Sequence, residues 1–480
     1  MTTEAVLGLD AGTTSTKAVV MASDGVVLAV GRSDPIATLS PEPGAAEQEP
    51  AQLARAMSEA TDRALSGLPS GVNLAAVAMA AQSGSVIPIG DDERPVGNLL
   101  TWMDARAAPI VDGWTGSERE LIRSISGWSP STGLGLASIS GIRSTQPDRF
   151  AAADRWASVD DHLLHTLAGV WRTNPSNASG MQLMDIATLE WDGRLCELAG
   201  VRAEQLAPIR RTGEIIGGIT SAAARWIALE SDIPVVVGGH DQACAALGLR
   251  ATTPGVVVLS AGTAWVLTVV TDRVAIDQLP LALNLSPHVV DDVWSASENL
   301  GGLGAMVDWW RRQAHGPDPE PGMIDADLAV ANPDGPLFVP ALMTRAENGS
   351  GRFVAEDRHD GVAERTRAVI EAAAFEVRRA LEPIARSVTR PRSLILVGGG
   401  ARSRRLRQLL ADVTRLPIEA PGDESWPALG AATIAATSLG WSLPDPVSEP
   451  ADVVEPAPDA ADAHDERFET YLRLVEGGST

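Results

Sequence analysis

Apolar residues recur along the chain with two different periods. The short apolar runs AVLGLD (residues 5–10) and KAVVM (17–21) flank a Gly/Thr-rich segment and predict a strand, a tight loop and a second strand. Helical spacing over residues 52–65 predicts an amphipathic helix, and the apolar run 74–81 predicts a buried strand. Strands that alternate with helices indicate an α/β fold.

The first strand–turn–strand pattern occurs a second time. Residues 256–270, VVVLSAGTAWVLTVV, again place an apolar strand, the tripeptide Ala-Gly-Thr and another apolar strand in succession. The two turns, at Gly12 and Gly262, lie about half a chain apart. Such spacing is typical of a duplicated domain.

Later segments carry weaker signals. The Pro/Gly-rich residues 315–323 predict a linker, and helical spacing returns over residues 365–388, before an apolar strand at 393–397. Residues 443–464 are rich in Pro, Asp and Glu and predict a loop, followed by a short helix around 466–474.

Length and composition indicate a globular protein of more than one domain. A chain of 480 residues exceeds what one hydrophobic core usually serves, so we expect two large domains with a cleft between them. The net charge of -24 argues against binding to nucleic acid or to an anionic membrane surface, since both need clustered Lys and Arg. An anionic ligand is therefore expected only at a local site.

Cysteine usage and the N-terminal segment favour a cytoplasmic location. Cys196 and Cys244 are the only cysteines, lie far apart and lack CxxC spacing, which favours a reducing compartment. The start MTTEAVLGLD lacks the basic and apolar regions of a signal peptide, and no long uncharged apolar run follows.

The first turn has the chemistry of a phosphate site. A strand that ends at Asp10 leads into backbone N–H groups and hydroxyls that can donate to phosphate oxygens. Lys17, the only lysine of the chain, would add a point charge, and Asp10 is a candidate ligand for a divalent metal. A plain hairpin is the alternative, but the repeated turn favours phosphate. The candidate contacts in the two turns are Gly12, Thr13, Thr14, Gly262 and Thr263.

A glycine cluster predicts a second ligand contact. Gly398-Gly399-Gly400 follows an apolar strand and precedes a helix, so a flat ligand can approach the backbone there and an anion the helix N-terminus. It is not the GxGxxG of a dinucleotide site, because no glycine stands three positions after Gly400. We predict contacts from Gly399, Gly400 and Ala401, and a tight turn packed on the sheet remains the alternative.

An apolar strand within residues 235–248 presents a candidate base. It runs into Gly238-Gly239 and then His240 and Asp241, the place where α/β proteins position ligands. Asp241 would accept a proton from a substrate hydroxyl, or would simply cap the following helix. We interpret His240 as structural, because no metal-ligand partner lies at suitable spacing.

The segment LLTWMDARAAP (residues 99–109) predicts a sugar contact. The indole of Trp102 can pack on the C–H face of a sugar, while Asp104 and Arg106 bind its hydroxyls. A surface salt bridge beside a buried Trp explains the same residues, and both interpretations stay open.

The order of these pieces resembles the FGGY carbohydrate kinases, a branch of the actin-like ATPase superfamily, over nearly the whole chain. The family's first phosphate motif is similar to residues 10–17, its second to 260–263, its catalytic Gly-x-x-Asp motif to 238–241, and its adenosine motif to 398–401 with Gln408, Ala411 and Asp412. The adenosine segment closes in ALGAATIAA (428–436), and residues 177–200 resemble the segment that leads toward the family's hinge.

The resemblance implies an α/β protein with two ribonuclease-H-like domains that flank a deep cleft. Residues 1–245 would form the N-terminal, mainly sugar-binding domain, and residues 246–480 the C-terminal, mainly ATP-binding domain. It also implies that Asp241 removes a proton from a sugar hydroxyl that attacks the γ-phosphate of Mg-ATP, with Mg²⁺ near Asp10. Some relatives carry Arg in place of Lys17, and relatives are often homodimers.

Departures from the family pattern bear on the substrate. Xylulose kinases usually show Gln-Met-His-Gly where this chain has Gln-Ser-Gly-Ser (residues 82–85), and the later Gly-Glu-Arg-x-Pro segment is replaced by residues 344–348. We therefore expect a small sugar, polyol or sugar acid as acceptor, a pentulose foremost. The implied substrate contacts are Gln82, Ser83, Trp102, Asp104, Arg106, Asp241 and Gln242.

Two rival functions remain. A non-catalytic relative that binds sugar or nucleotide for regulation is the main alternative, disfavoured because Asp10, Lys17 and Asp241 are all kept. A chaperone-type ATPase is disfavoured by the W-x-D-x-R segment and by the lack of a substrate-binding β-domain after residue 440.

Overall fold

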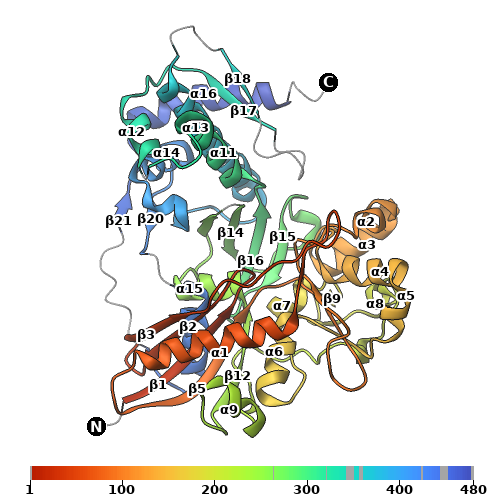
Figure 1. Ribbon diagram of the computed structural model, residues 1–480. Coiled ribbons are helices and arrows are strands. Elements are labelled where there is room, and N and C mark those ends of the chain that lie inside the picture. Colours follow the sequence, from red (N-terminus) through yellow and green to blue (C-terminus); the bar gives the residue numbers. More distant parts are fainter. Residues whose placement is uncertain are drawn as a thin grey trace.

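Two α/β lobes, each built on one large sheet, make up the protein (Figure 1). The computed structural model describes residues 3–262, 264–320, 322–341, 351–355, 360–422, 425–443 and 452–476. In this part of the chain no helix is long and apolar enough to cross a membrane. The predicted two-domain α/β architecture is confirmed.

In the described part of the chain, the N-terminal sheet has six strands in the order β11-β12-β5-β1-β2-β3. Their bounds are β1 Thr3–Ala11, β2 Thr16–Ala22, β3 Val27–Arg32, β5 Val72–Ala81, β11 Ile215–Gly218 and β12 Pro234–His240. β1 pairs antiparallel with β2 and parallel with β5, which places the first predicted turn at the centre of the sheet.

Helices cover both faces of this sheet. Leu7 and Leu9 of β1 pack with residues of α1 (Pro50–Ser66), whereas Val6 packs with α15 (Trp426–Ser438). Because successive side chains of a strand point to opposite faces, α1 and α15 lie on opposite sides. Burial on both faces explains why these strands are almost wholly apolar.

The C-terminal sheet repeats the central arrangement. Its order is β15-β16-β14-β13-β19-β20-β21, and β13 pairs antiparallel with β14 and parallel with β19, as β1 does with β2 and β5. The predicted duplication is therefore visible in the topology. The bounds are β13 Val256–Ala261, β14 Trp265–Thr271, β15 Asn284–Pro287, β16 Trp294–Asn299, β19 Ser393–Val397, β20 Ile418–Ala420 and β21 Asp452–Val454.

Further helices surround the sheets. They are α2 Ala108–Gly113, α3 Gly116–Ser126, α4 Gly135–Thr145, α5 Pro147–Ala151, α6 Val159–Ala168, α7 Pro175–Gly180, α8 Gly193–Ala199, α9 Ser221–Ile227, α10 Asp241–Gly248, α11 Leu303–His315, α12 Met323–Val330, α13 Val362–Ser387, α14 Arg404–Thr414 and α16 Pro458–Glu476. Short 3₁₀ turns span Ala203–Gln205, Ile276–Gln278 and Gly399–Arg402. The small strands are β4 Glu47–Gln48, β6 Ile87–Ile89, β7 Leu99–Leu100, β8 Arg155–Ala157, β9 Met184–Asp185, β10 Glu190–Trp191, β17 Leu337–Pro340 and β18 Gly351–Val354.

Two helices, α10 and α15, cross where the lobes meet, and glycines allow their close approach. A Cβ atom on Gly430 would lie 1.9 Å from the carbonyl oxygen of Cys244, and one on Gly248 would lie 2.3 Å from that of Trp426. Although α15 belongs to the second half of the sequence, it packs against the N-terminal sheet (Figure 1). The division of the chain at residue 245 stays a prediction.

The acidic tail is more ordered than its composition indicates. β21 adds a seventh strand to the C-terminal sheet, and α16 begins at Pro458, inside the segment predicted as a loop. Phe468 and Tyr471 of α16 are fully buried and contact Phe375 of α13. The loop prediction is wrong for residues 452–454 and 458–464, whereas the helix predicted around residues 466–474 is confirmed and begins earlier. The two aromatic side chains anchor this helix to the core.

Candidate active site

A cavity of about 420 Å³ is lined by residues from both halves of the chain. Its walls include Lys17 of β2, the start of α10, the end of β13 and the glycine turn; among the other lining residues are Gln242, Ser260, Gly398, Ala401 and Trp426. Asp10, residues 12–14 and Asp241 are not among the lining residues. A larger cavity of about 550 Å³ lies beside Trp171 and Trp191 and includes none of the predicted site residues. The chemistry of the lining therefore places the candidate site in the smaller cavity.

Asp10 and Lys17 form the charged centre of the first turn. They are paired positions on β1 and β2, and Nζ of Lys17 lies 3.5 Å from Oδ2 of Asp10. Burial raises the pKa of Asp10 to about 6, against the opposing effect of Lys17. The charge of Asp241 raises this pKa further, which places the two carboxylates within electrostatic reach of each other.

The hydroxyl of Thr13 is used inside the protein. It donates to Oε1 of Gln82 and accepts from Nε1 of Trp102, both at 2.9 Å. Among the described residues, no hydrogen bond uses the backbone N–H groups of Gly12, Thr13 or Thr14. If this turn binds phosphate, the backbone and not the Thr13 hydroxyl supplies the donors.

The second turn and the glycine turn pack on each other. Gly398 has φ of +90°, and a Cβ there would lie 2.9 Å from the carbonyl oxygen of Ala261; one on Gly400 would lie 3.0 Å from the Cβ of Ala261. A Cβ on Gly399 would meet nothing within 4 Å. The packing alternative thus explains Gly398 and Gly400, whereas Gly399 leaves space open to a ligand.

Several predicted contacts lie elsewhere or cannot be placed. Gln408 is not among the residues that line the cavity, and its Nε2 donates to Oδ1 of Asp412 at 2.9 Å and to the carbonyl oxygen of Glu455 at 3.0 Å. Its role toward a nucleotide stays a prediction. Thr263 and residues 344–348 lie outside the described residues.

Asp241 is the first residue of α10, directly after β12. His240 occupies the capping position, so Asp241 is not the helix cap that the sequence left open. Nε2 of His240 lies 3.0 Å from Oδ1 of Asp241, and the backbone N–H of His240 donates to Oγ of Ser176 at 2.9 Å. Gly238 lets β12 approach β5, since a Cβ there would lie 1.8 Å from the carbonyl oxygen of Met79. The carboxylate is therefore held at the N-terminus of α10, at the end of β12.

Unpartnered buried amides lie near the predicted acceptor residues. Ser83 donates from Oγ to the carbonyl oxygen of Asn177 at 3.1 Å. Asn177 is buried, and within the described part of the chain neither of its amide atoms has a hydrogen-bond partner; Nε2 of Gln82 has none either. Such groups are normally satisfied by ligand or ordered water. Sequence reasoning missed Asn177, because a buried Asn after a proline carries no signal of its own.

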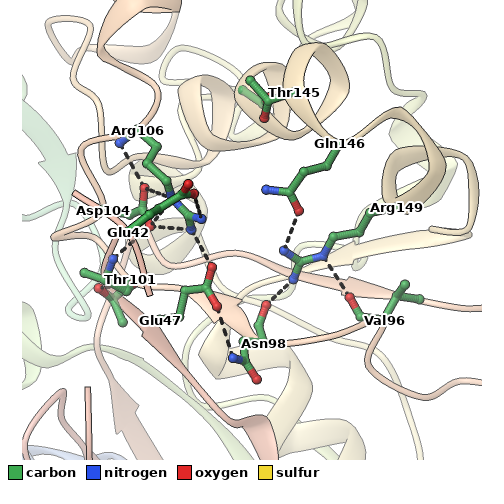
Figure 2. Close-up of polar contacts among 12 residues, drawn as sticks. Glu42, Glu47, Val96, Asn98, Thr101, Asp104, Arg106, Thr145, Gln146 and Arg149 are labelled. Atoms are coloured by element: carbon green, nitrogen blue, oxygen red, sulfur yellow. Dashed lines mark hydrogen bonds and ion pairs between the residues drawn. The ribbon is translucent and has the colours of Figure 1, made fainter. Parts of the chain in front are cut away.

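Asp104 and Arg106 are engaged with each other and with a distant segment (Figure 2). Arg106 donates from Nε to both carboxylate oxygens of Asp104 at 3.1 Å, from Nη1 to Glu42 at 2.9 Å and from Nη2 to Glu47 at 2.6 Å. Asp104 is buried, whereas the Trp102 residue is 41% exposed. The structure favours a supporting role for Asp104 and Arg106, and leaves the indole available to a sugar.

The residues fit a magnesium ion that is shared with phosphate. No group of three or more His, Cys, Asp or Glu side chains suited to a metal exists among the residues described. Mg²⁺ is commonly held by one or two carboxylates together with substrate phosphates. Asp10 suits this use, because no hydrogen bond between described residues occupies its Oδ1 atom.

Comparison with known proteins agrees with this geometry. The N-terminal domain model of the FGGY family of carbohydrate kinases matches residues 5–248, and the C-terminal domain model matches 257–439. Autoinducer-2 kinase of Yersinia enterocolitica is 27% identical, with 91% of this chain and 86% of the relative covered. A ligand-bound xylulose kinase from Lactobacillus acidophilus has a TM-score of 0.89 at 23% identity, covering 99% of both chains.

Plasmodium falciparum glycerol kinase, solved with ADP, has a TM-score of 0.86 at 18% identity and covers 99% of this chain and 98% of its own. These solved structures show the same fold. The family models together span both lobes and most of the chain. The chain therefore belongs to the FGGY family of carbohydrate kinases, phosphotransferases that act on a sugar hydroxyl.

Proposed function

We propose that this kinase transfers the γ-phosphoryl group of ATP to a hydroxyl of a small sugar, polyol or sugar acid, with a pentulose as the foremost class. Asp241 is the general base. The observation that carries the proposal is its position: Asp241 begins α10 beside Gln242 of the cavity wall and within electrostatic reach of the Asp10–Lys17 pair.

The shape of the cavity supports a nucleotide as phosphoryl donor. Its lining includes Ser260 of β13, Val397 of β19, Ala420 of β20 and Asp452 of β21, four strands that are adjacent in the sheet. At about 4.8 Å between strands, the site extends over roughly 14 Å. An elongated site of this kind, with Lys17 in its wall, suits a triphosphate that leads to a nucleoside. The ADP in the glycerol kinase structure supports the same choice.

The proposed reaction transfers one proton, forms one phosphorus–oxygen bond and breaks another. The acceptor hydroxyl attacks the γ-phosphorus as its proton passes to the carboxylate of Asp241. The new phosphorus–oxygen bond forms while the bond from the γ-phosphorus to the β–γ bridging oxygen breaks, and ADP leaves. His240, 3.0 Å from Oδ1 of Asp241, orients the base. Positioning and charge neutralisation account for most of such catalysis.

Charge at the phosphates is balanced by the first turn. Lys17 neutralises developing negative charge, and the backbone N–H groups of residues 12–14 orient the phosphate oxygens. Asp10 would hold Mg²⁺, which supplies further neutralisation of the phosphates when bound.

The acceptor pocket supports a small polyhydroxylated ligand. Trp102 is 41% exposed, and among the described residues Nε2 of Gln82 and both amide atoms of Asn177 have no hydrogen-bond partner. Ser83 and Gly84 leave a smaller wall than the Met-His pair of xylulose kinases, so a different pentulose, a polyol or a sugar acid fits this proposal. The relatives are named for autoinducer-2, xylulose and glycerol, which places all three in the panel to be tested.

The test is ADP release from purified protein with Mg-ATP, coupled to a spectrophotometric readout. The acceptors are D-xylulose, D-ribulose, xylitol, erythritol, D-fructose, D-gluconate, glycerol and autoinducer-2. We expect one acceptor to raise the rate far above the acceptor-free background. ATP binding without acceptor-dependent turnover across the panel contradicts the proposal and favours a regulatory relative.

A further inference from the structure

A strand of two residues joins the acceptor loop to the first phosphate turn. The acceptor loop is the segment 101–107, which carries Trp102 between β7 and α2. β4 consists of Glu47 and Gln48 and pairs antiparallel with β7, so that Glu47 lies opposite Leu100 and Gln48 opposite Leu99. Because successive side chains of a strand point to opposite faces, the two residues reach different partners.

Glu47 is fixed on the side of the acceptor loop (Figure 2). Its Oε1 accepts from Nη2 of Arg106 at 2.6 Å, and its Oε2 accepts from Nδ2 of Asn98 at 3.0 Å. The side chain is only 12% exposed, so the ion pair is little screened by water. Both carboxylate oxygens are thus oriented, and β4 is tied to the loop that carries Trp102.

The same loop is also tied to the residues just before β4. The backbone N–H of Ala46 donates to Oδ2 of Asp104 at 3.0 Å, and both the N–H and the hydroxyl of Thr101 donate to the carbonyl oxygen of Ala46. Three independent bonds therefore hold the register of β4 against the loop.

Gln48 is fixed on the side of the phosphate turn. It is fully buried, and its Nε2 donates to the carbonyl oxygen of Thr13 at 2.7 Å and to Oγ1 of Thr38 at 3.3 Å. The hydroxyl of the same Thr13 accepts from Nε1 of Trp102 at 2.9 Å. One turn residue therefore holds both the amide of β4 and the indole of the acceptor loop.

These contacts close a ring. It runs from Trp102 to Thr13, from Thr13 to Gln48, along β4 to Glu47, across to Arg106 and back along the loop to Trp102. We propose that Glu47 and Gln48 are positioning residues that hold the acceptor wall in register with the phosphate-binding turn. The proposal rests on the function proposed above for Trp102 and for the turn.

The ring makes the acceptor wall and the phosphate turn one rigid unit. In-line transfer demands that the acceptor hydroxyl and the γ-phosphate meet with small error, and a misplacement of about 1 Å costs about 100-fold in rate. If these contacts only stabilised the fold, the variants would have a lower melting temperature and unchanged KM values.

The test uses two variants and one matched control. Glu47→Gln keeps the size of the side chain and removes its charge, and Gln48→Leu removes the donor to Thr13. Glu49→Gln is the control, because the neighbouring carboxylate is exposed and, among the residues described, has polar contacts only with Arg55 and Gln52 at the surface. Each protein is assayed for the KM of its best acceptor from the panel, the KM of Mg-ATP, kcat and the melting temperature.

We expect kcat with the best acceptor to fall and the acceptor KM to rise, each about ten-fold, in both variants. The KM of Mg-ATP should be unchanged and the control equal to wild type. The double variant should match the worse single variant, because both residues belong to one ring and their effects are coupled. An unchanged acceptor KM overturns the proposal, and so does a fall in melting temperature with both KM values kept.

If Gln48→Leu does not fold, Glu47→Gln alone tests the proposal, and the same criteria apply. Wild-type protein that releases no ADP with any acceptor contradicts the proposed function itself and overturns the positioning role with it. Acceptor-dependent wild-type activity with unaltered variants overturns the positioning role alone.

Discussion

Nζ of Lys17 lies 3.5 Å from Oδ2 of Asp10, at facing positions of the β1–β2 hairpin, in the lobe that also carries Asp241. The only lysine of the chain is thus paired with a buried carboxylate in the turn that the sequence marks for phosphate. Its position supports the purpose proposed for this lysine at the phosphates, which composition alone does not.

Replacement of Lys17 tests that purpose. Lys17→Ala should raise the KM of Mg-ATP about ten-fold and leave the acceptor KM unchanged, because a charge near the phosphates is lost. Lys17→Arg is the matched control and should retain most of the affinity. Steady-state kinetics with both substrates varied gives the answer, and an unaltered Mg-ATP KM in Lys17→Ala would return the lysine to compositional drift.

The ionisation of Asp10 predicts a pH dependence of Mg-ATP use. With its pKa raised to about 6, the carboxyl is protonated below that pH and cannot hold a cation. We expect kcat/KM for Mg-ATP to fall as the pH drops through about 6, and the acid limb to move to lower pH at higher Mg²⁺. The test measures kcat/KM for Mg-ATP against pH at two Mg²⁺ concentrations. An acid limb at the same pH for both concentrations would contradict the prediction.

The same pKa shift predicts a stability effect of known sign. The folded state binds a proton on Asp10 more tightly than the unfolded state, whose carboxyl has the ordinary pKa of 3.8. The contribution of Asp10 to stability is therefore present below pH 3.8 and is lost as the pH rises to about 6. Urea unfolding should show Asp10→Asn gaining stability over wild type as the pH rises through this window. A difference in unfolding free energy between Asp10→Asn and wild type that does not change with pH would contradict the prediction.

Arg106 should be worth far more to stability than an exposed arginine. Arg106→Met leaves the carboxylates of Asp104, Glu42 and Glu47 without their shared cation, and we expect a loss of about 3 kcal/mol in the free energy of unfolding. Arg94→Met is the control, since the ion pair of Arg94 with Asp92 is exposed, and should change stability by less than about 1 kcal/mol. Equal losses of unfolding free energy for Arg106→Met and Arg94→Met, measured with urea, would contradict the stabilising role of the Arg106 network.

The crossing of α10 and α15 should be intolerant of a single methyl group. Gly430→Ala would bring Cβ within 1.9 Å of the carbonyl oxygen of Cys244, so the helices must separate, at a cost of about 1–3 kcal/mol. At Gly193 a Cβ meets nothing within 4 Å, and Gly193→Ala is the matched control. Denaturant midpoints compare the two, and a Gly430→Ala protein as stable as the control would argue against the close crossing.

Local patterns in the sequence predicted the elements that depend on neighbouring residues, such as strands and turns. The β1–β2 hairpin and its repeat at β13–β14 follow from apolar runs around Gly/Thr turns, and the structure confirms both. The role of Arg106 did not follow, because its partners Glu47 and Glu42 are 59 and 64 residues away in the sequence. Only the tertiary fold brings them together.

Two further differences have the same cause. The composition of residues 443–464 predicted a loop, whereas β21 pairs with β20 and α16 begins at Pro458, with Ala461 and His464 buried. Asn177 lies in the segment 177–200, whose sequence shows only a resemblance to the family. Its burial without a partner for the amide among the described residues is a property that a sequence does not display.

The central claim is that Asp241 is the base of a sugar kinase. The most direct measurement is acceptor-dependent ADP release by Asp241→Asn, with Mg-ATP affinity measured by calorimetry and the exposed Asp24→Asn as control. The account predicts that kcat falls by about 10²–10⁴ while Mg-ATP binding is nearly kept and the control is unaffected. Unchanged turnover in Asp241→Asn would contradict the assignment.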